Sequence, residues 1–287
     1  MRPVPSILPL LFVFLWSTGF IGAKFGLPYA EPLSFLLVRY LLVLTLMTIL
    51  ALVSGAPWPS GGSQLLHLGV SGLLLHALYL GGVFMAIKNG LPAGVTALVV
   101  GLQPLLTAAG AGFLLGERVA PRQWLGLVIG LAGVALVVAN KIGDLPLAAM
   151  LLPALAALSG ITAGTLYQKR FCAHFDLRSG SVVQFLPTTV CTALVAWWTE
   201  SMHIEWTGEF VFALLWLVLV LSVGAISLLN LLIRSGSAVN VASLFYLTPP
   251  STALIAWLVF GETLGAVAIA GMLLAVLGVY LARLPPR

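Results

Sequence analysis

The sequence predicts an all-α integral membrane protein, and three observations support this fold class. Hydrophobic residues make up 61% of the 287 residues and charged residues only 7%, whereas a soluble domain averages about 25% charged residues. The mean hydropathy is +1.13. The few charged residues are separated by long apolar segments that lack the alternation of apolar and polar residues typical of a membrane β-barrel. Together these features exclude a soluble globular enzyme, a disordered protein and a nucleic-acid-binding protein.

Segments without Asp, Glu, Lys or Arg define the helices, because about 20 apolar residues span the hydrocarbon core. Nine such segments occur, and eight of them have the length of one helix. The ninth, 40–87, has room for two helices and contains a cluster of turn-forming residues at 54–63. The sequence therefore predicts ten transmembrane helices, in order 6–23, 33–53, 65–87, 91–115, 121–139, 147–167, 180–198, 210–232, 237–260 and 264–282.

The first segment and the two cysteines add little to this scheme. Residues 6–23 are expected to form an uncleaved helix, because no small-residue cleavage site followed by a soluble region is present. Cys172 falls in a predicted loop and Cys191 in the seventh helix, so no disulfide framework is expected.

The distribution of basic residues predicts the orientation. With ten helices both termini lie on one side, and if that side is cytoplasmic its segments carry nine basic residues against three in the outer loops. Such a bias in short loops follows the positive-inside rule. The inner residues are Arg2, Arg118, Arg122, Lys169, Arg170, Arg178, Arg234, Arg283 and Arg287, and the outer ones are Lys24, Lys88 and Lys141. We therefore expect a protein of the plasma (inner) membrane with both termini cytoplasmic.

The chain also repeats itself at a nearly constant spacing. Residues 87–90 resemble residues 233–236, and Pro104 has a counterpart in Pro250. Gly116-Glu117 and Gly261-Glu262 continue the series in the same order. Each half, 1–143 and 144–287, thus holds five helices. Because five is odd, the two repeats must have inverted topology, which is typical of secondary transporters with a site near the membrane midplane between the halves.

With these features the sequence resembles the drug/metabolite transporter (DMT) superfamily, EamA type. The residues that carry the resemblance are Leu15 to Phe20 with Lys24 in the first helix, Arg39 in the second, Gly116-Glu117-Arg118 with Gly126 and Gly133, and Gly261-Glu262 with Gly271 and Gly278. The resemblance covers nearly the whole chain and implies a ten-helix transporter that exports or exchanges small metabolites. The aromatic residue of the first helix, Trp16, has no aromatic counterpart near Leu158-Ser159-Gly160 in the sixth.

Polar residues and prolines in the middle of apolar helices mark a candidate pathway, because polar groups are costly in the hydrocarbon core. Proline removes a helix hydrogen bond, and the carbonyl groups freed near residues 100 and 246 need protein or a water-filled cavity. The expected helix breaks are Pro104, Pro249 and Pro250, the expected pathway entrance is Lys24, and the expected substrate-binding residues are Trp16, Arg39, His76, Tyr79, Gln103, Gln184, Tyr246 and Thr248. A purely structural role is an alternative for each: a packing kink, an interhelical hydrogen bond, or, for Arg39, a side chain that snorkels to the interface.

The function expected from these residues is transport of small metabolites, amino-acid-like or other organic solutes, by alternating access. We expect no catalytic residues, no metal and no cofactor, because no ATP-binding motif, carboxylate pair or Cys/His cluster is present. The expected partners are a small-molecule substrate and the lipid bilayer, without nucleic acid, and a homodimer is left open. The alternatives are a polytopic membrane enzyme acting at the bilayer interface and a structural membrane subunit that does not transport.

Overall fold

The computed structural model describes residues 7–107, 110, 121–139, 147–172, 175–225, 228, 245–262 and 265–283. The described part of the chain is helical, apart from turns and one isolated antiparallel bridge between Ala30 and Ile204. Its elements are α1 (Ile7–Gly26), α2 (Pro32–Val53), α3 (Gly62–Gly72), η1 (Leu73–Leu78), α4 (Tyr79–Lys88), α5 (Ala93–Val100), α7 (Pro121–Ala139), α8 (Leu147–Phe171), α9 (Leu177–Thr199), α10 (Gly208–Leu215), η2 (Trp216–Ala225), η3 (Phe245–Leu247), α13 (Thr248–Phe260) and α14 (Ala266–Arg283).

Six of the described helices are long and apolar enough to span a membrane. They are Ile7–Gly26, Pro32–Val53, Gly62–Lys88, Ala149–Phe171, Leu177–Thr199 and Gly208–Ala225. Four shorter apolar helices accompany them: Ala93–Thr107, Trp124–Gly133, Thr248–Phe260 and Ile269–Gly278. The prediction of an all-helical membrane protein is thereby confirmed.

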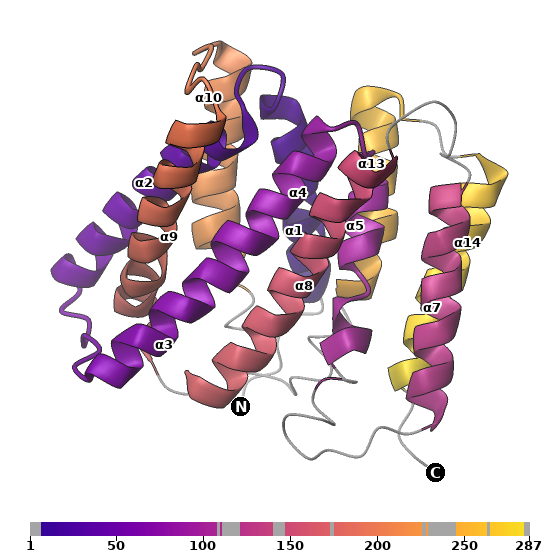
Figure 1. Ribbon diagram of the computed structural model, residues 1–287, viewed down its shortest axis with the longest axis horizontal. Coiled ribbons are helices and arrows are strands. Elements are labelled where there is room, and N and C mark those ends of the chain that lie inside the picture. The colour runs from indigo at the N-terminus through magenta and orange to yellow at the C-terminus, as the bar shows by residue number, and fades with distance from the viewer. Residues whose placement is uncertain are drawn as a thin grey trace.

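The helices lie side by side in one bundle (Figure 1). The neighbours α7 and α14 form one edge of it, and α2 packs on α9 toward the opposite edge. The helix α1 is surrounded by α5, α10, η2 and α13. Since α1 and α5 come early in the chain whereas η2 and α13 come late, the centre of the bundle is built from both halves of the sequence.

Four described segments depart from regular α-helix, and three of them lie in the interior of apolar helices. The backbone of η1 and of η2 is π-helical, a form that is rare and often found at functional sites. The helix that begins at Ala93 is interrupted by a turn at Gly101 and Leu102. The 3₁₀ turn η3 precedes α13, whose first turn contains Pro249 and Pro250. The expected residues 237–244 of the ninth helix lie outside the described residues, as does much of 108–120.

Glycines allow three of the helix contacts to be unusually close. A Cβ atom at Gly72 would collide with the backbone carbonyl of Gln184, so the end of α3 and α9 meet almost backbone to backbone. A Cβ atom at Gly160 would lie 2.9 Å from the Leu74 carbonyl oxygen of η1. At Gly278 it would lie 2.5 Å from the carbonyl oxygen of Gly126, which is why α7 and α14 pack tightly together. Small residues are the usual means of such close approach in membranes.

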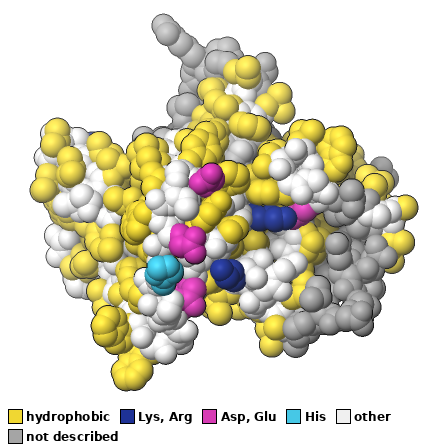
Figure 2. Space-filling view, turned by 90° about the horizontal axis from the view of Figure 1, so that it is seen from above, with side chains coloured by type: hydrophobic (Ala, Val, Ile, Leu, Met, Phe, Trp, Pro, Cys, Tyr) yellow, Lys and Arg dark blue, Asp and Glu magenta, His cyan; other side chains and the backbone are white. Residues whose placement is uncertain are grey.

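The two ends of the bundle are fastened by polar contacts between loops. At the end that is uppermost in Figure 1, the carboxylate of Glu200 accepts hydrogen bonds from the backbone N–H groups of Leu33 (2.8 Å) and Ser34 (2.7 Å) at the start of α2. Glu31 in turn accepts bonds from the N–H and hydroxyl of Ser201. Figure 2 shows this face, where acidic and basic side chains gather amid apolar surface.

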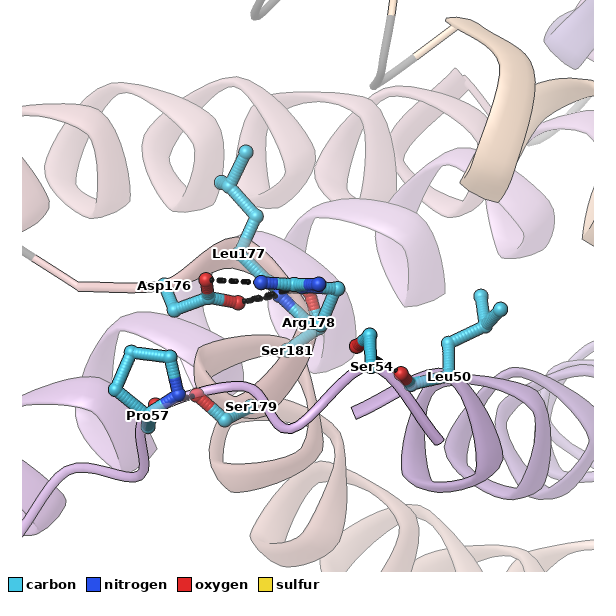
Figure 3. A network of polar contacts seen from close by, with 8 residues as sticks. All are labelled: Leu50, Ser54, Pro57, Asp176, Leu177, Arg178, Ser179 and Ser181. Carbon is cyan, nitrogen blue, oxygen red and sulfur yellow. Dashed lines mark hydrogen bonds and ion pairs between the residues drawn. The ribbon is translucent and has the colours of Figure 1, made fainter. Parts of the chain in front are cut away.

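At the other end, the connection between α8 and α9 is capped. Asp176 accepts a hydrogen bond from the backbone N–H of Arg178 (2.9 Å) and pairs with its guanidinium (2.8 Å), as Figure 3 shows. Ser179 donates to the carbonyl oxygen of Pro57 (2.6 Å), which ties the start of α9 to the loop after α2. The N-terminal turn of α9 is therefore held from both sides.

Candidate functional site

A narrow cavity lies in the interior of the bundle, between α1, α4, α5, α8 and the start of α13. Its wall consists mostly of aromatic and small apolar side chains with a few neutral polar ones. The lining residues are Trp16, Phe20, Tyr79, Ala97, Val100, Gly101, Gln103, Pro104, Ile161, Phe245 and Thr248. We call Trp16, Tyr79, Gln103 and Thr248 the cavity group.

The cavity forms where the interruption of one helix faces the start of another. The interruption is the turn at Gly101 and Leu102 after α5, and the start is the 3₁₀ turn η3 followed by Thr248, the first residue of α13. A Cβ atom at Gly101 would lie 2.8 Å from Cγ of Pro249, so the two segments are in direct contact. Backbone groups freed from helical bonding are tolerated at this depth only where they face protein or a cavity.

The hydroxyl of Thr248 is the clearest sign that this space takes a polar partner. Thr248 is buried, and its Oγ1 has no hydrogen-bond partner. A buried polar atom is almost always satisfied by protein or water, so this hydroxyl is available to a water molecule or a solute in the cavity. The carbonyl oxygen of Thr248 does have a partner, the hydroxyl of Ser17 on α1 (3.4 Å).

Two other members of the cavity group, Gln103 and Trp16, are held by neighbouring side chains. The amide of Gln103 donates to the hydroxyls of Thr107 (3.1 Å) and Thr165 (3.4 Å). The indole ring of Trp16 meets the ring of Phe245 edge to face, with 5.1 Å between centroids. A ring held in this way is suited to stack on a small organic solute, and the remaining amide oxygen of Gln103 is suited to accept a hydrogen bond from it.

The cavity is small in this conformation. Its volume is about 20 Å³, whereas a single water needs roughly 10–15 Å³ by the same measure. A metabolite therefore requires the surrounding helices to move apart.

A second polar cluster lies in the bundle away from the cavity wall. Arg39 of α2 is 7% exposed, and its guanidinium donates to the hydroxyl of Ser222 in η2 (3.4 Å), while its Nε has no partner. Gln184 of α9 donates to Ser71 (2.9 Å) and lies beside His76 of η1. We call Arg39, His76, Gln184 and Ser222 the Arg39 group.

The Arg39 group is packed rather than hollow. The ring of His76 stacks on Phe185 at 4.1 Å between centroids. The backbone carbonyl of His76 accepts a hydrogen bond from the Tyr40 hydroxyl (2.8 Å), which ties η1 to α2. The guanidinium of Arg39 interacts electrostatically with Tyr79, and Tyr79 also lines the cavity. Tyr79 therefore connects the Arg39 group to the cavity group.

The sequence-predicted residues are therefore divided between these two places. Trp16, Tyr79, Gln103, Pro104 and Thr248 line the cavity, and Pro249 touches its edge. Arg39, His76 and Gln184 lie in the Arg39 group, while Pro250 lies in the first turn of α13 and the side chain of Tyr246 lies outside the described residues. Lys24 lies at the end of α1, where it pairs with Glu262.

Sequence reasoning missed several residues of the cavity wall. Phe20 lies one helical turn after Trp16 and on the same face, a spacing that could have identified it. Phe245 and Gly101 carry no such signal, because an aromatic residue or a glycine in an apolar helix is most often a packing residue. Among the described residues, no three His, Cys, Asp or Glu side chains lie close enough together to hold a metal ion.

Comparison with known proteins finds relatives along the whole chain. The model of the EamA-like transporter family matches residues 5–139 and again 147–284. The uncharacterized transporter YvbV of Bacillus subtilis (strain 168) is 30% identical over 284 residues, which cover 96% of this chain and 90% of that protein. A "probable amino-acid metabolite efflux pump" of Salmonella typhimurium is 26% identical over 96% of this chain and 93% of its own length.

Two further relatives agree with these matches. The uncharacterized inner membrane transporter YedA of Escherichia coli (strain K12) is 27% identical over 88% of this chain and 82% of its own length. A solved crystal structure superposes with a TM-score of 0.65, covering 96% of this chain and 95% of its own, at 21% sequence identity. That structure therefore supports the fold alone.

Proposed function

The chain belongs to the EamA-like transporter family and transports small metabolites across a membrane, and we propose that it does so by alternating access to the cavity between its two halves. The observation that carries this proposal is the contact between a helix interruption in one half and the start of α13 in the other, beside a buried and unpaired Thr248 hydroxyl. The named relatives are transporters rather than enzymes. By similarity to YedA, the membrane is the inner membrane.

We further propose that the fold consists of ten transmembrane helices in two inverted five-helix repeats. The family model matches each half separately, which supports this arrangement. Irregular helices at equivalent places support it as well. The π-helical η1 and η2 occupy corresponding stretches of the third and eighth helices, and the irregular turns at Gly101 and just before Thr248 fall in the fourth and ninth.

Within the cavity, the residues take different roles. Trp16 and Tyr79 form aromatic walls on which a planar or apolar part of the solute packs, and Gln103 and Thr248 form hydrogen bonds with its polar part. Arg39, His76 and Gln184 act from behind Tyr79, where the charge of Arg39 biases the cavity toward solutes with a carboxylate. Tyr246 and the proline breaks complete the predicted site.

The proposed substrate is an amino-acid-like or other small organic solute, exported or exchanged. The neutral, partly aromatic wall supports this class, because it offers stacking and a few hydrogen bonds without a fixed acidic group. The name of the Salmonella relative points to the same class. A cavity of about 20 Å³ must widen to admit such a solute, so helix movement is part of the mechanism.

For the orientation, we propose that both termini are cytoplasmic, as the basic residues of the short loops indicate. The test is labelling of single cysteines in intact cells after Cys172 and Cys191 have been replaced by alanine. An impermeant maleimide should label His203→Cys and leave Ser60→Cys unlabelled, because these exposed residues lie in loops of opposite expected sides. The reverse pattern would overturn the orientation.

The function is tested by uptake of a labelled metabolite panel into proteoliposomes. Counterflow of at least one organic solute, abolished by the double variant Gln103→Ala/Thr248→Ala in folded protein, is the expected result. Absence of flux for every solute would favour a structural subunit. Chemical conversion of a solute without its movement would favour a membrane enzyme.

A further inference from the structure

An ion pair joins the two halves of the chain at the end of the bundle where α1 and α13 terminate. Lys24 lies in the last turn of α1, and Glu262 follows directly after α13. Their side chains form a salt bridge although the residues are 238 positions apart. The side chain of Lys24 is 30% exposed and that of Glu262 is 14% exposed, so the pair is partly withdrawn from water.

Aromatic side chains surround this pair. The Nζ atom of Lys24 lies 4.6 Å from the centre of the Phe260 ring, which adds a cation–π contact. The ring of Phe25 lies 6.3 Å from that of Phe260 and 6.2 Å from that of Phe212. The ion pair thus lies beside a row of three aromatic rings, Phe260, Phe25 and Phe212.

The same two helices form part of the cavity wall. Helix α1 carries Trp16 and Phe20, and α13 begins at Thr248. With 1.5 Å of rise per residue, Lys24 lies about 12 Å along α1 from Trp16, and Phe260 lies about 18 Å along α13 from Thr248. If α1 and α13 separate at this end, the cavity opens toward it and the ion pair breaks.

The pair is placed to resist that opening. A fully exposed ion pair contributes little to stability, because water screens both charges. Here one partner is mostly buried and the other also contacts a ring, so the charges of the intact pair are screened less than those of an exposed pair. The other described lysine at this end, Lys88, instead donates to the carbonyl oxygens of Leu27 (2.8 Å) and Ala30 (3.5 Å) within its own half.

We propose that the Lys24–Glu262 ion pair is an electrostatic latch that holds the cavity closed at the end where α1 ends. The latch must break each time the cavity opens to that side. This inference rests on the proposed alternating access, but its test measures accessibility rather than transport.

The test uses Val100→Cys, at the cavity wall, as a reporter in protein without Cys172 and Cys191. An impermeant maleimide is applied from the Lys24 side of sealed vesicles. Lys24→Met and Glu262→Gln should each raise the labelling rate roughly threefold to tenfold. The exchange Lys24→Glu/Glu262→Lys should return it toward the wild-type rate, and Lys88→Met should leave it unchanged.

The outcomes separate this inference from the proposed function. Unchanged labelling in both neutral variants, or an equal rise in Lys88→Met, would overturn the latch even if transport is found. A rise confined to the Lys24 and Glu262 variants would establish the latch even if no solute of the panel moved. Failure of the charge exchange to restore the slow rate, with folded protein, would mean that the two charges do not act on each other.

Discussion

The cavity group and the Arg39 group are both polar clusters inside apolar helices, yet their surroundings differ. In the cavity group, Thr248 has an unpaired hydroxyl beside open space, and the turn after α5 meets the start of α13 there. In the Arg39 group, Gln184 is hydrogen-bonded to Ser71 and Gln168, and His76 is stacked on Phe185. A polar residue in a membrane helix therefore serves either a pathway or the packing, and the space beside it distinguishes the two.

This difference has a cause in the backbone. The cavity group lies where α5 ends at Gly101 and where prolines occupy the first turn of α13, so regular helical packing is broken on both sides. The Arg39 group lies where Gly72 lets the end of α3 approach the backbone of α9 very closely. Changes to each group should therefore affect different properties of the protein.

The largest effect is expected for Gly72→Ala, which tests whether packing fixes the Arg39 group. The added methyl group would collide with the backbone of Gln184, and a backbone cannot move aside as a side chain does. We expect the free energy of unfolding to fall by about 3 kcal/mol, the upper range for overpacking. Thermal unfolding in detergent measures it.

The matched control for that change is Gly69→Ala in the same helix. A methyl group there would lie 3.5 Å from Cγ of Pro187, an ordinary contact, so its stability should equal or slightly exceed that of the wild type. If both variants unfold at the same temperature, the close contact of α3 with α9 does not determine stability.

The next largest effect is expected for Gln103→Ala, which should lower transport by at least about tenfold while the protein stays folded. Gln103 lines the cavity and its two amide N–H groups donate to Thr107 and Thr165, so alanine removes the amide oxygen as an acceptor for the solute. Gln184→Ala is the comparison, since it should lower the unfolding temperature and leave transport per folded molecule within about threefold. Equal transport losses in the two variants would remove the distinction between the groups.

Sequence alone identified part of this arrangement for a physical reason. Polar atoms and prolines are costly within a bilayer, and Trp16, Tyr79, Gln103 and Thr248 were predicted on that ground or from a neighbouring position. Their placement at one cavity is a feature of the tertiary structure. The same free-energy cost of a polar side chain in the bilayer applies to His76 and Gln184. The sequence pattern therefore could not distinguish the cavity group from the Arg39 group.

Other features have no local signal at all. Phe245 and Gly101 are ordinary residues of apolar helices until the fold brings them to the cavity wall. The partners Lys24 and Glu262 belong to different halves, and each alone resembles a charged residue at a helix end. Helix boundaries, by contrast, follow from charge and turn residues, and Pro32–Val53 differs from the expected 33–53 by one residue.

A smaller effect is expected for Arg39→Gln, which tests whether the Arg39 group influences the cavity through charge. The guanidinium lies within electrostatic range of Tyr79, so its loss should weaken transport of a carboxylate-bearing solute about fivefold more than transport of a neutral analogue. Competition between the two solutes in proteoliposomes measures this ratio. Arg39→Lys, which keeps the charge but not the planar donors, should preserve most of the preference for the carboxylate-bearing solute.

The contrary result for Arg39 is a parallel loss for charged and neutral solutes. Arg39 would then hold α2 to η2 through Ser222 and take no part in selectivity.

The smallest effect is expected at Asp176, which lies outside both groups and should alter stability without altering transport. Hydrogen bonds from Arg178 hold the pKa of the Asp176 carboxyl below its usual value. A lowered pKa means that the stabilisation is present above pH of about 4 and is lost as the pH falls further.

Asp176→Ala should cost about 1 kcal/mol at neutral pH, as for other helix caps, and should flatten the acid side of the stability profile. Asp176→Asn keeps the cap without the charge, so it should retain most of the stability while showing the same flattening. A change in solute flux in either variant would show that this end of the bundle also takes part in transport.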